Sequence, residues 1–566
     1  MAQISGTLIT RNYRNFSGVD FSNRGDEVSL NHSPNALNVW KNYRSSNGRC
    51  IETRPDLELV KTYEDAIYGL YFYTINGTTH KIVHSGTKLY KDDTVIYSSM
   101  AEHKSLYFIY NDKLYISDAT NYLVYDGTTV ASVVGYIPTT SISRAPLGGG
   151  AIYEDVNMLS DYRKNSFCAD GTSTEYKLDV ESMDDDYTPR VWVNDTELTS
   201  GFTPNYETGK VTFTTAPAEP LTPGQDNVVI QFKKYVEGYK ERVLNCTLIE
   251  TFDNRVFFSG NSNYPNVLFH CGLNDPSYFS DTDYYEEGSS DSKVKSLVAG
   301  NNALWVLKEP SQSNTTIFYH NPTIDSEHGK IYPSTHSSIS TGCMAKGINF
   351  NDSIVFFSDK GLESITGDVT TEQVLLHRSS LVDSRLLNEE KYKEMDLIEY
   401  AGYLFTIMGN KVYLADGNTL TPINNHYEYE WFYFEFDKDI SGAVVKNDIL
   451  YMTSGKDIYT FTKTDTNIES YWTTIEDEFN YPQYQKTMNK KGFVIDMEGE
   501  ELLVYVRTDN KDFQLIKKYK NKKGYIVSKK KKKKWKSVQI KFYSTKPFSL
   551  YSNTLEAYVG SYVKRW

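Results

Sequence analysis

A strand unit that recurs with variations is the feature that most limits what this chain can fold into. Each unit reads as an apolar strand, a short polar turn and an aromatic-rich strand, followed by Asp or Asn with Gly. The clearest unit runs from Leu106 to Gly127, and similar units start near Ile67, Leu248, Leu297, Ile348, Leu397 and Val444. A unit of this size cannot bury its apolar face alone. Repetition at roughly 30 to 45 residues therefore predicts a β-propeller, whose four-stranded blades pack on their neighbours.

The turns inside these units support hairpins. Asp253-Asn254, Asn351-Asp352 and Ala401-Gly402 each separate two runs of aromatic and β-branched residues, which is the pattern of two strands joined by a tight turn. The alternative is that any tyrosine-rich all-β protein shows such hairpins. The existence of blades is therefore better supported than their number.

Composition agrees with a large β-rich chain. The 566 residues are 39% hydrophobic and include 46 Tyr and 27 Phe, enough to bury the cores of two to four domains. Helical periodicity is confined to residues 379–393. The sequence predicts an all-β fold.

Several classes of protein are disfavoured by what the sequence lacks. No run of about 18 apolar residues and no signal-peptide pattern occurs, so we expect a soluble, unsecreted chain without stable membrane insertion. Five widely spaced cysteines without a CxxC pair favour free thiols. No phosphate loop, HExxH or zinc spacing occurs and the ten histidines are scattered, with His80 and His84 read as one face of a strand. We predict no catalytic, cofactor-binding or metal-binding residues.

The pattern changes along the chain. Residues 1–62 are polar and irregular and are predicted to form an extended N-terminal arm that lies on another subunit or on the propeller. Blades are expected at 63–140 and again at 243–466. Between them, strands with turns every 8 to 12 residues predict an inserted β-sandwich with linkers at 141–242. Residues 467–566 are predicted to form a C-terminal β-rich domain, or else to supply a strand that closes the propeller.

Charge is unevenly distributed. The net charge is −13, yet lysines gather at 517–523 and 529–534. Such a segment could bind phosphates, nucleic acid or an acidic partner, but a solvated hairpin tip is the favoured interpretation. Aromatic residues do not alternate with these lysines as a nucleic-acid stacking platform requires, since Tyr519 alone stands among them.

Several short segments follow one another along the chain in an order that can be compared with the order of segments in known families. Near the N-terminus lie Phe16-Ser17-Gly18-Val19-Asp20, the asparagine-rich stretch 35–40, Asn47-Gly48-Arg49 and Arg54-Pro55. They are followed by segments at 87–91, 294–319, 537–542 and 547–550. In this order they resemble the tail nozzle or tail hub proteins of short-tailed double-stranded DNA bacteriophages, relatives of which are known as head–tail stabilisation proteins. Asp56 stands where that family commonly has glycine. The likeness covers most of the chain outside residues 140–240.

The resemblance implies a structural virion protein of the tail, assembled in the host bacterial cytoplasm. It would form a homo-oligomeric ring, expected to be a hexamer, below the portal and adaptor proteins at the head–tail junction or as the terminal nozzle. Viral DNA would be retained and then ejected through the ring without sequence-specific binding. The residues expected at the interface with partner proteins lie in the arm: Trp40, Arg44, Arg49, Arg54 and Pro55.

Two other classes compete with this interpretation. One is a receptor-binding or carbohydrate-binding tail component, with the sandwich at 166–235 as the contact module. The other is a glycan hydrolase on a propeller, which needs paired carboxylates. Because no Asp-box motif was recognisable, we predict that the chain is not an enzyme. Acidic groups such as Asp184-Asp185-Asp186, or Asp281, Asp283, Glu286 and Glu287, could line a conduit but more often occupy solvated loops.

Overall fold

The computed structural model divides the chain into two compact units. It describes residues 6–45, 50–311, 315–326, 329–366, 373–423, 426–465, 467–509, 511–528 and 533–562. Unit 1 comprises Met1–Phe72 and Thr341–Trp566, and unit 2 comprises Tyr73–Ser340. Strand β6 (Ile67–Ile75) crosses the boundary between them.

Unit 2 contains four antiparallel sheets with strands in sequence order or nearly so. The first two are β6, β7 (Thr78–Ser85), β8 (Lys88–Lys91) and β9 (Thr94–Tyr97), then β10 (Leu106–Tyr110), β11 (Lys113–Ser117), β12 (Tyr122–Tyr125) and β13 (Val130–Ser132). The third is β23 (Leu248–Phe252), β24 (Arg255–Ser259), β25 (Val267–His270) and β26 (Tyr284–Glu286). The fourth is β27 (Val294–Gly300), β28 (Ala303–Lys308), β29 (Ile317–His320) and β32 (Ser334–His336), with a small hairpin of β30 (Thr323–Asp325) and β31 (Gly329–Ile331) beside it in sequence.

Unit 1 contains three further sheets of this kind. One is β33 (Gly347–Phe350), β34 (Ser353–Phe357), β35 (Leu362–Thr366) and β36 (Val374–His377). The next is β37 (Asp396–Tyr400), β38 (Tyr403–Ile423) and β39 (His426–Ile440). The last is β40 (Gly442–Lys446), β41 (Ile449–Ser454) and β42 (Asp457–Lys463), completed by the N-terminal strand β5 (Asp56–Thr62).

The first hairpin of every one of these sheets has the same turn. Two residues with positive φ join the first strand to the second, as at Asn111 (45°) and Asp112 (57°) or Asn301 (52°) and Asn302 (59°). Positive φ at both central residues defines the type I′ turn, which matches the twist of the flanking strands and favours Asn, Asp and Gly. The equivalent pairs elsewhere are Asn76-Gly77, Asp253-Asn254, Asn351-Asp352, Ala401-Gly402 and Asn447-Asp448.

Neighbouring sheets stack through their first strands. In unit 2, β10 contacts β23 and β23 contacts β27; in unit 1, β33 contacts β37 and β37 contacts β40. Aromatic and aliphatic side chains fill the space between sheets, for example Tyr122 against Phe258 in unit 2 and Phe405 against Phe461 in unit 1. Four-stranded sheets stacked in this way are propeller blades. The predicted all-β propeller fold is confirmed.

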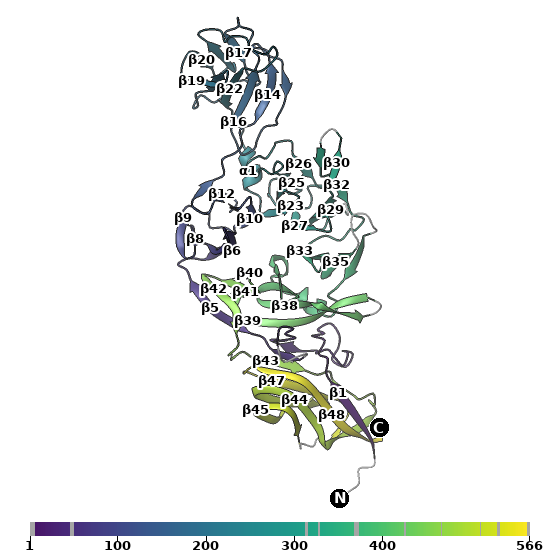
Figure 1. Ribbon diagram of the computed structural model, residues 1–566. Coiled ribbons are helices and arrows are strands. Elements are labelled where there is room, and N and C mark those ends of the chain that lie inside the picture. Colours follow the sequence, from purple (N-terminus) through teal and green to yellow (C-terminus); the bar gives the residue numbers. More distant parts are fainter. Residues whose placement is uncertain are drawn as a thin grey trace. The chain divides into compact units, whose positions relative to one another are not determined.

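The insertion in unit 2 is a small β-sandwich (Figure 1). One sheet has the order β15 (Ala151–Ile152), β14 (Thr139–Arg144), β16 (Tyr162–Phe167), β22 (Val228–Lys233), β18 (Arg190–Val193) and β19 (Thr196–Leu198). The other has β17 (Glu175–Lys177), β21 (Lys210–Phe213) and β20 (Phe202–Asn205). Phe167, Tyr176, Val211 and Phe232 belong to the buried core. The short helix α1 (Tyr239–Leu244) follows the sandwich.

The C-terminal residues form a large sheet that includes the start of the chain (Figure 1). Its long strands are β44 (Tyr484–Thr508), β45 (Gln514–Ser528), β47 (Val538–Ser544) and β48 (Phe548–Tyr562), with the short strands β43 (Ser470–Thr473) and β46 (Lys533–Trp535). Strand β1 (Thr7–Tyr13) pairs along β48, while β2 (Ala36–Leu37) pairs with β43. Strand β3 (Val39–Trp40) pairs with β4 (Ile51–Thr53), which in turn pairs with β48.

The structure therefore corrects the prediction of an extended arm at residues 1–62. Strands β1 to β4 belong to the C-terminal sheet, and β5 completes the blade formed by β40 to β42. A strand added at an edge satisfies the unpaired backbone groups there. This blade is completed from the N-terminal side of the chain and not by a strand from the C-terminal domain.

The helix that the sequence predicts at residues 379–393 is much shorter in the structure. Within residues 379–393 the structure has only α2 (Asp383–Leu386) and the start of a 3₁₀ turn at Tyr392–Glu394. In the part of the chain that the structure describes, no helix is long and apolar enough to cross a membrane. None of the five cysteines, all of which lie in the described ranges, forms a disulfide bond.

Candidate functional site

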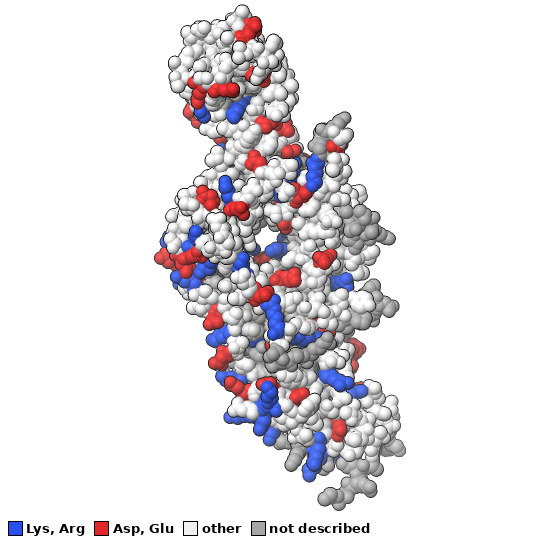
Figure 2. All heavy atoms as spheres, viewed as in Figure 1, with Lys and Arg blue, Asp and Glu red and all other residues white. Residues whose placement is uncertain are grey.

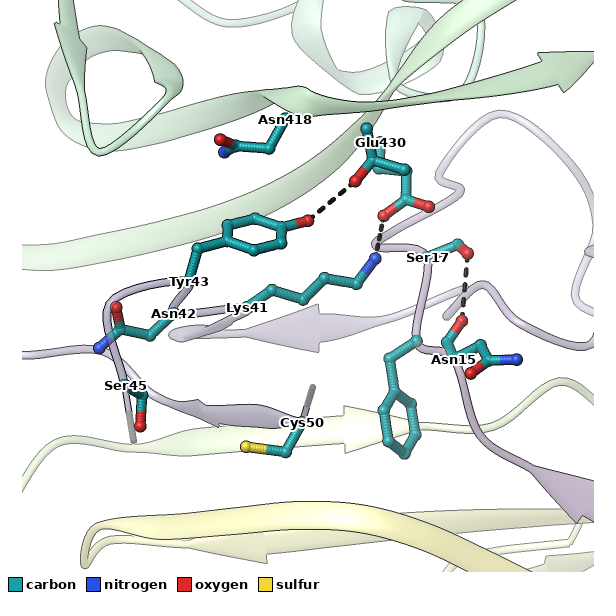
Figure 3. A pocket seen from close by; sticks show the side chains of 11 residues that line it. Asn15, Ser17, Lys41, Asn42, Tyr43, Ser45, Cys50, Asn418 and Glu430 are labelled. Carbon is teal, nitrogen blue, oxygen red and sulfur yellow. Dashed lines mark hydrogen bonds and ion pairs between the residues drawn. The ribbon is translucent and has the colours of Figure 1, made fainter. Parts of the chain in front are cut away.

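A pocket of about 440 Å³ lies in unit 1, between the N-terminal segment and the β38–β39 hairpin (Figure 3). Its lining residues are Asn15, Phe16, Ser17, Lys41, Asn42, Tyr43, Ser45, Cys50, Asn418, Thr419 and Glu430. A volume of this size is within the range of small-molecule sites.

A bulge in β38 shapes the pocket wall. The pairing with β39 shifts between Asp416 and Leu420, so that the intervening residues leave the ladder. Gly417 donates a hydrogen bond to the carbonyl of Gly402 (2.9 Å), and a Cβ at Gly417 would lie 2.4 Å from the ring of Phe350. Glycine is therefore required there. Bulges commonly redirect side chains beside functional sites, and here the two residues after Gly417 line the pocket.

Two carboxylates are paired beneath this bulge. Asp416 and Glu430 are directly opposite in the β38–β39 register, so their side chains project from the same face. They are 0% and 3% exposed. Like charges at such positions repel one another unless neighbours neutralise them. Lys41 forms an ion pair with Glu430, and the hydroxyl of Tyr43 donates to Asp416 (2.6 Å).

These neighbours give the two acids different surroundings. Burial raises the pKa of Asp416, and the hydrogen bonds from Tyr43 and Asn418 oppose that shift. Burial also raises the pKa of Tyr43, and its hydrogen bond to Asp416 adds to the effect. The buried ring of His32 has its pKa lowered by burial, an effect that the negative charge of Glu430 opposes. The site thus combines an acid that holds its proton more readily than usual with one that a lysine neutralises.

The remaining wall is polar but unreactive. Burial raises the pKa of Cys50 to about 12, so this residue is a neutral thiol at neutral pH. Asn42 donates to Glu52 (2.8 Å), and Tyr43 also contacts the hydroxyl of Thr419 (3.0 Å). Hydroxyls, amides, one cation and one carboxylate facing a pocket beside an aromatic ring suit a ligand rich in hydroxyl groups. No three His, Cys, Asp or Glu side chains among the described residues are placed to hold a metal ion.

Two of the predicted interface residues, Trp40 and Arg54, make their contacts inside the chain. Trp40 is 2% exposed and packs against the rings of Tyr403 and Phe434. Arg54 is 3% exposed, and it donates to Asn38 (2.9 Å) and to the carbonyl of Glu435 (2.9 Å). Burial lowers the pKa of Arg54 to about 10, although Asp56 acts in the opposite direction. Both side chains fix the N-terminal segment onto unit 1 and present no surface to a partner.

The other predicted interface residues differ. Arg44 is partly exposed, contacts Asp448 (3.2 Å) and lies over the ring of Tyr400. Pro55 is half-buried. Arg49 lies outside the residues that the structure describes. These positions share no common surface feature that would single them out as a site.

The predicted acidic candidates also have partners within the chain. Asp186 pairs with Lys233, and Asp184 accepts from the backbone of Tyr235 (2.7 Å) in the sandwich. Asp281 accepts from the hydroxyl of Tyr239 (3.0 Å). Glu287 is fully buried beside His320, 2.9 Å away. Among the histidines, His84 is fully buried and His80 pairs with Asp92.

Sequence reasoning missed the pocket residues Glu430, Lys41 and Tyr43, and it missed Asp416, which lies behind the pocket wall and accepts from Tyr43. The two acids are fourteen positions apart, and only the bulged register brings them opposite one another. The available signal was the interrupted pattern Ala415-Asp416-Gly417-Asn418 inside an otherwise apolar strand, because Gly in a strand often marks a bulge.

Comparisons with known proteins find structural similarity only at low identity and low TM-score. No family model and no curated protein matches it. Similar solved structures include BamB from Moraxella catarrhalis, with TM-score 0.31 and 10% identity over 71% of this chain and 96% of that one. An exo-β-1,3-galactanase from Phanerochaete chrysosporium has TM-score 0.19 and 10% identity over 55% of this chain and 94% of the other. A protein described as a glycoside hydrolase has TM-score 0.20 and 9% identity over 87% and 97%.

One prediction is corrected by these comparisons. The sequence led us to predict that the chain is not an enzyme, but glycoside hydrolases are among the similar structures. The exclusion of catalysis is therefore withdrawn. The likeness concerns the fold and assigns no reaction to this chain.

Proposed function

We propose that the chain is a structural subunit of a ring in a short-tailed double-stranded DNA bacteriophage, at the head–tail junction or as the tail nozzle. The ring is a homo-oligomer, expected to be a hexamer, that joins the portal and adaptor proteins and conducts DNA. Its net charge of −13 opposes adhesion of the DNA backbone, so that DNA passes without sequence-specific binding.

One structural observation supports this proposal. Parts of the resemblance at the two ends of the chain, within residues 36–40 and 538–550, contribute strands to the same sheet of unit 1. Ile51 pairs with Leu550 and Glu52 pairs with Ser549, so residues just before Arg54-Pro55 lie beside the closing stretch Phe548-Ser549-Leu550. Segments of the resemblance that are about 500 positions apart in sequence thus meet in one sheet, while the segments at 87–91 and 294–319 belong to blades of unit 2.

The proposal is tested in the virion. Particles that assemble without this protein should package DNA and then lose it, because the conduit that retains the genome is incomplete. The measurement is the fraction of heads that contain DNA, with the intact protein supplied in trans as the control. Particles that lack the protein yet keep their genome and infect normally would contradict the proposal.

The pocket favours a second candidate, a carbohydrate-binding tail component. Calorimetry with purified bacterial surface glycans should show binding that Glu430→Gln and Tyr43→Phe weaken at least about tenfold, since each removes a polar group of the pocket. Lys113→Gln, on the exposed β11, is the control. Release of reducing ends in the same samples reads out hydrolysis. Unchanged affinity in both pocket variants would eliminate the pocket as the binding site.

A further inference from the structure

The outer face of the C-terminal sheet in unit 1 carries a row of half-buried tyrosines. Tyr471 is opposite Tyr543, Tyr543 is opposite Leu503, and Lys541 is opposite Tyr505. Residues opposite one another share a face. The other face of the same strands, with Trp472, Phe542 and Val504, is buried in the core. The tyrosines thus form an outward-facing layer over a well-packed sheet.

Lys541 lies among these rings. Its Nζ is 3.7 Å from the centroid of Tyr471 and 5.5 Å from that of Tyr543, while Tyr505 and Tyr543 meet edge to face at 6.2 Å. Aromatic residues are enriched in protein interfaces, and a cation over their faces is attracted by the rings. These tyrosines come from three strands other than β45, so the sequence around the lysines of 517–523 did not reveal them. We call residues 471, 503, 505, 541 and 543 the tyrosine face.

One end of the tyrosine face is basic. Leu503 is opposite Lys518 on β45, a strand that pairs only with β44 among the described residues. Exposed lysines follow along this strand: Lys517, Lys518, Lys520, Lys522 and Lys523. Glu501 and Glu498 pair with two of them, at 2.5 and 2.9 Å. Figure 2 shows Lys and Arg side chains gathered over the part of the molecule where Figure 1 places β44 and β45.

The other end is acidic. Leu37, opposite Tyr471, lines a groove of about 520 Å³. The groove contains five carboxylates, those of Asp56, Glu435, Asp437, Asp465 and Glu469, against the two cations Arg54 and Lys463. Arg54 forms an ion pair with Asp56 (3.3 Å) and also donates to Asn38 and to backbone carbonyls, so it leaves the other four carboxylates with Lys463 as the remaining cation of the wall. Glu435, Asp437, Asp465 and Glu469 are exposed. The groove therefore carries excess negative charge that nothing in its own wall balances.

We propose that the basic strand β45 of one copy of this chain docks into the acidic groove of the next copy, with the tyrosine face beside the contact. A ring needs a heterologous interface, in which two different patches of each subunit meet. Lysines at one end and carboxylates at the other supply such a pair, and the tyrosines supply apolar area between them. The inference rests on the proposed ring and specifies how its subunits meet.

The interpretation of β45 as a solvated edge remains the competing explanation. Lysines on an edge strand also prevent strands from pairing with other molecules. That role requires no acidic counterpart, whereas docking requires both patches. Charge reversal of each patch separates the two explanations.

The experiment uses two variants of the full chain. The first carries Lys518→Glu, Lys520→Glu and Lys522→Glu, and the second carries Glu435→Lys, Asp437→Lys and Asp465→Lys. Each should fail to self-associate at concentrations where the natural chain assembles, because like charges then face each other. Mixed in equal amounts they should reassemble, since each reversed patch meets its complement. Mass in solution by light scattering is the measurement, and circular dichroism verifies that each variant folds.

A matched control carries Lys113→Glu, Lys360→Glu and Lys393→Glu, three exposed lysines elsewhere. It has the net charge of the first variant and should assemble normally. Assembly of the natural chain should also weaken as salt rises from 0.05 to 0.5 M, a readout that needs no variant.

Two negative outcomes have different meanings. If the natural chain assembles and both charge-reversed variants assemble equally well, the docking inference is overturned and the ring proposal stands. If the natural chain stays monomeric at all concentrations and with portal and adaptor rings, the ring proposal itself fails, and the interface with it.

Discussion

At the residue scale, His377 is held between two carboxylates. Its Nε2 lies 2.6 Å from Asp383 and its Nδ1 lies 3.3 Å from Glu363. Burial acts to lower the pKa of His377, but the hydrogen bonds to Asp383 and Glu363 outweigh it and raise the pKa to about 10. The imidazolium therefore stabilises the fold at neutral pH.

The consequence for stability has a definite sign. Because the pKa of His377 is higher in the folded chain than the ordinary 6.5, its contribution is complete below about pH 6.5 and is lost as pH rises through about 10. We expect His377→Gln to lower the free energy of unfolding by about 1–3 kcal/mol at pH 6, an amount reduced for a side chain that is one-third exposed. Urea unfolding at pH 6 and pH 10.5 checks this. A deficit that is equal at both pH values would show that the charge of His377 is not responsible.

Trp40, Arg54 and Arg44 separate a role in folding from a role in partner binding. Trp40→Ala should cost about 3–5 kcal/mol because it leaves a cavity among aromatic rings. Arg54→Ala should lower the free energy of unfolding by about 3 kcal/mol or more, because it leaves buried hydrogen-bond acceptors without a donor. Arg44→Ala, at a partly exposed ion pair, should cost less than about 1 kcal/mol. Denaturant unfolding followed by circular dichroism measures all three. Natural stability in the Trp40 and Arg54 variants would contradict the packing described here.

At the element scale, the type I′ turns explain why the blade pattern was readable from sequence. Asn301-Asn302 joins β27 to β28 with both φ angles positive. Replacing both by Ala should destabilise the chain by about 2–4 kcal/mol, at about 1–2 kcal/mol for each residue forced into the left-handed region. Asn302→Gly should be neutral or slightly stabilising. Thermal unfolding of the two variants tests the turn, and an equal loss in both would argue against it.

The inserted sandwich is expected to fold alone. Its core is contributed by its own strands, from β16 to β22, so residues 137–235 expressed separately should unfold cooperatively in urea. A gradual, non-cooperative transition would contradict this. The structure also changes the design of any deletion. Removing residues 166–235 would cut the last two residues from β16 and take away β22, one of its two partner strands, so that only the pairing with β14 would be left.

The sequence predicted those parts of the fold in which the contacting residues are close to one another along the chain. Blades are built from adjacent strands, and turn residues such as Asp253-Asn254 announce them locally. The N-terminal segment was misread because its partners are distant: Thr7 pairs with Val559, and Ala36 with Trp472. No periodicity within residues 1–62 encodes such pairing. The tyrosine face was missed for the same reason, since its members come from β43, β44 and β47.

The candidate pocket was hidden by register. A shift of one residue moves a strand's side chains to the opposite face, so the bulge after Asp416 decides which residues face Glu430. Trp40 and Arg54 were predicted to lie at an interface with partner proteins, whereas the structure buries both within the chain. Their burial shows that a Trp or Arg in a polar segment can be a core anchor and not a contact for a partner.

At the scale of the whole molecule, the chain has propeller blades and two additions. One addition is the sandwich in unit 2, and the other is the sheet in unit 1 that contains both ends of the described chain. The proposed ring gives the excess charges on that sheet a role. A chain with net charge −13 and a locally basic strand can associate with its own acidic surface.

Whether the chain forms a ring is decided by the mass of the purified full chain in solution. The mass is measured at low salt, for the chain alone and for the chain mixed with the portal and adaptor rings. We expect a species that contains several copies of the 64.8 kDa chain and that particle imaging shows as closed rings. A chain that remains at 64.8 kDa under all these conditions would contradict the ring. Binding of surface glycans by that monomer would then favour the pocket as the functional site.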